Sequence, residues 1–134
     1  MGRAAVFNGI DPKRFLTRLE RQRNICRTSG AAMLHQLADQ FETASLGYVE
    51  AHGLERDADW FVLKMQEELG ELTQVWNKLT GRGRRRDRPE SDLRADLANE
   101  AADLLGHVLL FARRNELDLA SAIERKWRFR PLGE

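Results

Sequence analysis

Two pairs of carboxylates stand inside stripes of apolar residues in this sequence. Glu68 and Glu71 are three residues apart, as are Glu100 and Asp103, so each pair shares one face of an expected helix. A carboxylate that faces a core must be paired, protonated or metal-bound, because burying an isolated charge is costly. The stripes comprise Phe61, Met65, Leu72, Val75 and Leu79 around the first pair and Leu93, Leu97, Leu104, Val108 and Phe111 around the second.

The spacing of these acids indicates a metal site. We find no matching set of cations nearby in the sequence, so a hard divalent cation is the expected partner. Oxygen-only ligands favour Mg²⁺, with Mn²⁺ as a substitute. Glu-rich helices more often present their acids to water, so a lone EExxE would be weak evidence. Carboxylate pairs on two facing helices, however, are a known way to build metal sites inside helical bundles.

The two-part motif, EExxE at 67–71 and ExxD at 100–103, resembles that of the MazG-type nucleoside triphosphate pyrophosphohydrolases. This all-α superfamily includes dCTP pyrophosphatases, dimeric dUTPases and phosphoribosyl-ATP pyrophosphatases. The resemblance covers roughly Ala38 to Arg130 and includes the turn at 117–119 into a last helix. It implies a four-helix-bundle-like MazG fold, assembled as a homodimer or a dimer of dimers. The implied reaction splits a nucleoside triphosphate between its α- and β-phosphates, giving a monophosphate and pyrophosphate.

The resemblance also implies roles for individual residues. Lys126 matches a lysine that family members carry near the end of the last helix, and we expect it to contact the leaving pyrophosphate. Glu67 lies about 100° around the helix from its neighbour. It either holds another ion, orients the nucleophilic water as a base, or is an ordinary solvated glutamate. The expected metal ligands are Glu68, Glu71, Glu100 and Asp103.

Five further residues are candidates for binding the nucleotide. His107 follows Asp103 by one turn, where dCTP-directed relatives have a tyrosine; the alternative is a satisfied core histidine. Trp60 could wall a base pocket, although aromatic residues at helical spacing are more often core. Arg114 either binds phosphate or interacts with the helix dipole. Arg130 replaces an asparagine common in the family, and Lys78 completes the set.

Helical periodicity runs through almost the whole chain, with no convincing β alternation. Asp11-Pro12 predicts the start of a helix that Ser29-Gly30 ends, and Asp57 and Ser91 are expected N-caps. We predict an N-terminal extension at 1–30, helical in part, and a MazG-like domain at 31–134. The expected helices span residues 11–27, 31–52, 57–80, 91–115 and 118–127.

Composition is consistent with a small enzyme of the cytoplasm. The 134 residues are 42% hydrophobic and 32% charged, which suffices for one core. A formal net charge of +1 argues against a protein built mainly to coat nucleic acid. The single cysteine, Cys26, fits a reducing compartment, and we find no signal peptide or membrane-spanning stretch.

A basic loop separates the two acidic helices. Arg82, Arg84, Arg85, Arg86 and Arg88 occupy five of seven positions. Such runs are usually solvated, but this one could steer a triphosphate or bind nucleic acid. The sequence therefore leaves two alternatives to a Mg²⁺-dependent enzyme of nucleotide-pool sanitation. One is a nucleic-acid-binding or regulatory helical module, and the other is a family member that binds nucleotide or metal without turnover.

Overall fold

The computed structural model of the protein describes the backbone of residues 12–131 and the side chains from residue 30 to 131. This part of the chain contains helices and no strand, so the all-α prediction is confirmed. Searched over the same residues, no helix is long and apolar enough to cross a membrane. The helices are α1 (Pro12–His52), α2 (Ala58–Leu79), α3 (Glu90–Arg114) and α4 (Leu119–Trp127).

The chain divides into two compact units. One consists of Leu34–Asp118 and contains the end of α1 together with α2 and α3. The other combines the chain up to Met33 with the residues from Leu119 onward, including α4. All four predicted metal ligands belong to the first unit, whereas Lys126 and Arg130 belong to the second.

The first helix corrects one prediction. Instead of ending at Ser29-Gly30, α1 continues through both residues to His52; Asp11, its expected cap, lies outside the described residues. A single glycine inside a helix costs only about 1 kcal/mol relative to alanine. The residues that follow, Ala31 to Leu34, are good helix formers and no proline interrupts them, so the helix continues.

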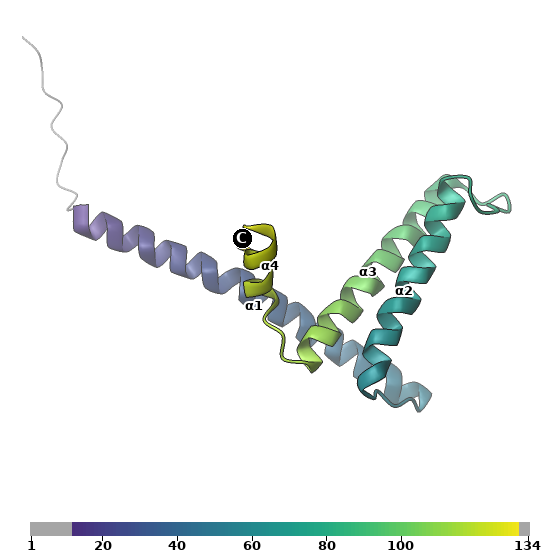
Figure 1. Cartoon of the computed structure of the whole chain (residues 1–134), viewed down its shortest axis with the longest axis horizontal. Coiled ribbons are helices and arrows are strands. Elements are labelled where there is room, and N and C mark those ends of the chain that lie inside the picture. Colours follow the sequence, from purple (N-terminus) through teal and green to yellow (C-terminus); the bar gives the residue numbers. More distant parts are fainter. Residues whose placement is uncertain (1–11, 132–134) are drawn as a thin grey trace, which may run out of the picture. The chain divides into compact units, whose positions relative to one another are not determined.

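The helices α2 and α3 form an antiparallel hairpin (Figure 1). Asp57 caps α2 as predicted, because its side chain accepts a hydrogen bond from the Trp60 backbone N–H at 2.8 Å. Gly81 follows the end of α2 with a φ of +78°, which glycine adopts without strain. The buried apolar residues of the hairpin include Phe61 and Val75 from α2 and Leu93, Leu109 and Leu110 from α3.

The start of α3 corrects a second prediction. Pro89, and not Ser91, is the N-cap residue, and no side chain caps this end. The Ser91 hydroxyl instead lies 3.3 Å from the Asp92 carboxylate. Proline restricts its own φ, here to −58°, and the acids Glu90 and Asp92 in the first turn interact favourably with the helix dipole. The helix can therefore begin without a hydroxyl cap.

The end of α1 is held against the base of this hairpin by polar and close apolar contacts. The Arg56 guanidinium donates to both Glu42 carboxylate oxygens, at 2.8 and 3.0 Å, and to the Ser45 hydroxyl at 3.2 Å. Phe41 lies so close to Gly106 that an added β-carbon at Gly106 would stand 2.6 Å from the ring. These contacts position the end of α1, from Leu34 to His52, over the part of α3 that carries His107.

The Glu42–Arg56 ion pair gives a testable pH dependence. The hydrogen bond from Arg56 lowers the pKa of Glu42 below its ordinary value of 4.5. The pair therefore stabilises the fold fully above about pH 4.5, and this contribution is lost as the pH falls through the depressed pKa. We expect Glu42→Gln to lower the free energy of unfolding by about 2 kcal/mol at pH 7, with a smaller difference from wild type below pH 4. Urea denaturation across pH measures this.

The control is Glu50→Gln, which changes an exposed glutamate of the same helix. It should leave the unfolding free energy within about 0.5 kcal/mol of wild type. An equal loss in both variants at pH 7, or a Glu42→Gln effect that persists unchanged at pH 3, would contradict the role assigned to this pair.

Candidate functional site

Three of the four predicted metal ligands meet between α2 and α3. One carboxylate oxygen each from Glu68, Glu71 and Glu100 lies within 4.8 Å of the others. Glu68 is buried, with 6% of its surface exposed, while Glu100 is half-buried and Glu71 is exposed. The three carboxylates thus converge from two helices, as the spacing predicted.

The negative charges of these acids repel one another. Desolvation raises the pKa of Glu100 above its ordinary value of 4.5, and the negative charges of Glu71, Glu68 and Asp103 raise it further. An all-oxygen donor set with accumulated negative charge suits a hard divalent cation. The donor chemistry of this group therefore fits a metal ion.

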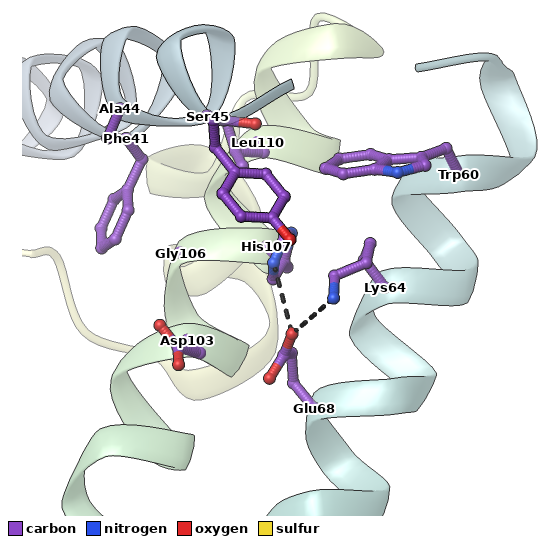
Figure 2. A pocket seen from close by; sticks show the side chains of 11 residues that line it. Phe41, Ala44, Ser45, Trp60, Lys64, Glu68, Asp103, Gly106, His107 and Leu110 are labelled. Carbon is purple, nitrogen blue, oxygen red and sulfur yellow. Dashed lines mark ion pairs between the residues drawn. The ribbon is translucent and has the colours of Figure 1, made fainter. Parts of the chain in front are cut away.

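Asp103, the fourth predicted ligand, has a different position. It lies one turn after Glu100 on α3, is exposed, and is outside the group of three close carboxylates. Its side chain lines a pocket that also includes Glu68 (Figure 2). Asp103 therefore belongs to the pocket wall and not to the close group of carboxylates.

Lys64 belongs to the site but was not predicted from the sequence. Its ammonium lies 2.9 Å from a Glu67 oxygen and 3.0 Å from a Glu68 oxygen. The sequence was expected to hold no matching set of cations near the acids, and this single lysine gives Glu68 one cationic partner. A lysine three and four residues before two glutamates is a common ion-pair pattern on a helix. This spacing could have predicted the contact from the sequence.

Lys64 and Glu67 change the electrostatics of this face of α2. Burial favours a lower pKa for Lys64, but its hydrogen bonds to Glu67 and Glu68 outweigh that effect and raise the pKa. Lys64 is therefore charged at neutral pH. Glu67 is exposed and ion-paired with Lys64, which differs from the free solvated glutamate considered above.

A pocket of about 290 Å³ adjoins the acidic group. It lies between the end of α1, the start of α2 and the second half of α3, all within the same compact unit (Figure 2). Its polar lining consists of Ser45, Lys64, Glu68, Asp103 and His107, and its aromatic lining of Phe41, Tyr48 and Trp60.

Two predicted nucleotide-binding residues, Trp60 and His107, line this pocket. Their rings meet edge to face, with centroids 5.5 Å apart. The His107 Nε2 lies 3.6 Å from the Glu68 carboxylate, and its Nδ1 is buried with no hydrogen-bond partner among the described residues. Burial lowers the pKa of His107 below 6.5, and the charge of Glu68 opposes this only in part. His107 is thus a neutral ring with one unsatisfied nitrogen, unlike the satisfied core histidine considered as its alternative.

The other predicted substrate-binding residues are not among those that line the pocket. Lys78 is half-buried near the end of α2. The hydrogen bond from Arg88 lowers the pKa of Asp96, and the charge of Lys78 adds a smaller effect in the same direction. Arg114 is exposed and ends α3. In the other compact unit, Lys126 is exposed in α4, and Arg130 forms an ion pair of 2.6 Å with Glu124.

The basic loop between α2 and α3 is exposed at all five arginines. Arg88 forms an ion pair of 2.6 Å with Asp96, and Arg85 lies 3.9 Å from Glu90. The loop joins α2 and α3 at the end of the hairpin far from the C-terminal end of α1 (Figure 1), and none of its arginines lines the pocket.

Comparisons with protein-family models, with curated proteins and with solved structures find no significant match to this chain. A functional assignment must therefore rest on the chemistry of the acidic group and its pocket.

The raised pKa of Glu100 predicts a gain in stability on its neutralisation. An acid whose pKa is raised in the folded state destabilises the fold at pH values above that raised pKa. The cost disappears at pH values below its ordinary pKa of 4.5, where the acid is protonated in both states. Without metal at pH 7, Glu100→Gln should therefore raise the melting temperature, and the gain should vanish below pH 4. Saturating Mg²⁺ should reverse the order, because only the wild type retains all three carboxylates.

Scanning calorimetry of metal-free and Mg²⁺-loaded protein measures both effects. Glu55→Gln removes a charge from an exposed position between α1 and α2 and serves as the control. A Glu100→Gln protein that melts below wild type without metal would show that repulsion among these carboxylates is not a cost to the fold.

Proposed function

We propose that this protein is a Mg²⁺-dependent nucleoside triphosphate pyrophosphohydrolase of the MazG type. The observation that carries the proposal is the meeting of Glu68, Glu71 and Glu100 within 4.8 Å, with Glu68 buried. A buried carboxylate among like charges is unfavourable for folding alone. Lys64 compensates only one of the three negative charges, and a divalent cation that the reaction needs would compensate the others.

Glu68, Glu71 and Glu100 would hold the metal, and Asp103 would reach it from the pocket side. Mg²⁺, with Mn²⁺ as a substitute, neutralises phosphate charge and lowers the pKa of bound water when it is bound at such a site. Glu67 is exposed beside Glu68 and, once released from Lys64, could accept a proton from the nucleophilic water. Lys126 is our candidate for contacting the departing pyrophosphate, on the family resemblance alone.

The pocket supplies a place for the nucleoside. Trp60 offers an aromatic face against which a base can stack, and the half-buried His107 ring lies beside it in the pocket wall. Because Glu68 and Asp103 belong to the pocket wall, a nucleotide bound there would present its phosphates to the carboxylates. This arrangement supports a nucleotide substrate over an inorganic phosphate.

The MazG-type fold and its assembly are part of the same proposal. Val62, Leu69 and Trp76 are exposed at seven-residue intervals along α2, and Leu105 and Val108 are exposed on α3. Such a stripe is typical of a helix that packs against another helix. We therefore propose a homodimer or a dimer of dimers in which these stripes complete a four-helix bundle, working in the cytoplasm.

Burial of Glu68 distinguishes this proposal from a nucleic-acid-binding module. Binding through the exposed Arg82–Arg88 loop has no need of an acid in the core, and two of the loop's arginines are already near acids. A family member without turnover would retain the carboxylates but release no product. Product analysis separates these alternatives.

The test is a panel of standard and modified ribo- and deoxynucleoside triphosphates with Mg²⁺, with phosphorus NMR to resolve the products. We expect at least one substrate to yield a monophosphate and pyrophosphate. Glu68→Gln should lower turnover by about 100-fold or more, equivalent to about 2.7 kcal/mol in the barrier. The control Glu55→Gln should keep full turnover.

Direct release of orthophosphate would contradict cleavage between the α- and β-phosphates. Turnover of Glu68→Gln near the wild-type rate would exclude the carboxylate group as the centre of the reaction. Nucleotide binding with no product from any member of the panel would favour the family member without turnover.

A further inference from the structure

The contact between Lys64 and Glu68 has a consequence for metal binding. The Lys64 ammonium points at the Glu68 carboxylate from one turn earlier on α2, at 3.0 Å (Figure 2). Glu68 is also one of the three carboxylates that lie within 4.8 Å of one another. One carboxylate is therefore shared between a resident cation and the proposed metal position.

Simultaneous binding of the Lys64 ammonium and a divalent cation to Glu68 is unfavourable. A divalent ion on the three glutamates would lie close to the Lys64 ammonium, and their repulsion is little screened because Glu68 is buried. Glu67, the second partner of Lys64, is exposed and can hold the ammonium only weakly once Glu68 is engaged elsewhere. Binding of the metal therefore works against the Lys64–Glu68 contact.

We propose that Lys64 is a built-in counter-ion that neutralises Glu68 in the metal-free protein and gives way when the divalent cation binds. The inference rests on the metal position proposed above. It makes Lys64 a positioning residue: it compensates the charge of the buried carboxylate and holds the carboxylate in place, and in doing so it weakens metal binding in the absence of substrate.

A nucleotide bound in the pocket would give the Lys64 ammonium a new anionic partner. Lys64 lines the pocket together with Ser45 and Trp60, and its long side chain has several rotatable bonds. Once Glu68 is bound to metal, the triphosphate of a nucleotide in the pocket is the nearest new anion. Metal and nucleotide binding are then coupled, because each favours release of Lys64 from Glu68.

Calorimetric titration of Mg²⁺ without nucleotide tests this exchange. Lys64→Met keeps most of the apolar stem and removes the charge, so it should bind Mg²⁺ at least about fivefold more tightly than wild type. In Mg²⁺, the same variant should bind a non-hydrolysable α,β-methylene triphosphate more weakly. Lys64→Gln, which keeps a hydrogen-bond donor, should give the same two shifts.

Arg94→Met is the matched control, because Arg94 forms an i, i+4 ion pair with Glu90 on the exposed face of α3. It should change neither affinity. Unchanged or weaker Mg²⁺ binding in both Lys64 variants would overturn the exchange and leave the pyrophosphohydrolase proposal standing. Absence of Mg²⁺ binding in wild type and variants alike would overturn both.

Discussion

The buried carboxylate of Glu68 is the constraint on which the rest of this site depends. It lies on the core-facing side of α2, where an ionised group is stable only with charged or hydrogen-bonding partners. Lys64 supplies one partner and His107 faces it from α3, while Glu71 and Glu100 add like charge. A fold that places three carboxylates together in this way is poised to bind a cation.

The acidic group and the aromatic pocket occupy neighbouring parts of one helical hairpin. The close acids Glu68, Glu71 and Glu100 lie toward the middle of α2 and α3, and the aromatic residues nearer the end of α1 line a pocket of about 290 Å³. Glu68 and Asp103 belong to the wall that joins them (Figure 2). This continuity between an acidic group and an aromatic pocket is the reason for proposing a nucleoside triphosphate as the substrate class.

Local patterns predicted the parts of the site that lie on regular helices. The i, i+3 spacing placed Glu68 and Glu71 on one face of α2 because it depends only on helical periodicity. Spacing alone did not predict that Glu100, and not Asp103, would join them, because that depends on how α3 packs against α2. Phe41 and Ser45 were not identified as pocket residues, because their proximity to α3 depends on long-range packing at the end of α1. The predicted stop at Ser29-Gly30 was wrong because helix formers on its C-terminal side outweigh one glycine.

Anomalous diffraction from crystals grown with MnCl₂ tests the central claim most directly. Mn²⁺ can replace Mg²⁺ at oxygen-rich sites and can be located by its anomalous signal. We expect a peak in coordination distance of carboxylate oxygens from Glu68, Glu71 and Glu100, with the Lys64 ammonium displaced from Glu68. Crystals in which Mn²⁺ occupies only surface positions, while Lys64 remains on Glu68, would contradict the account.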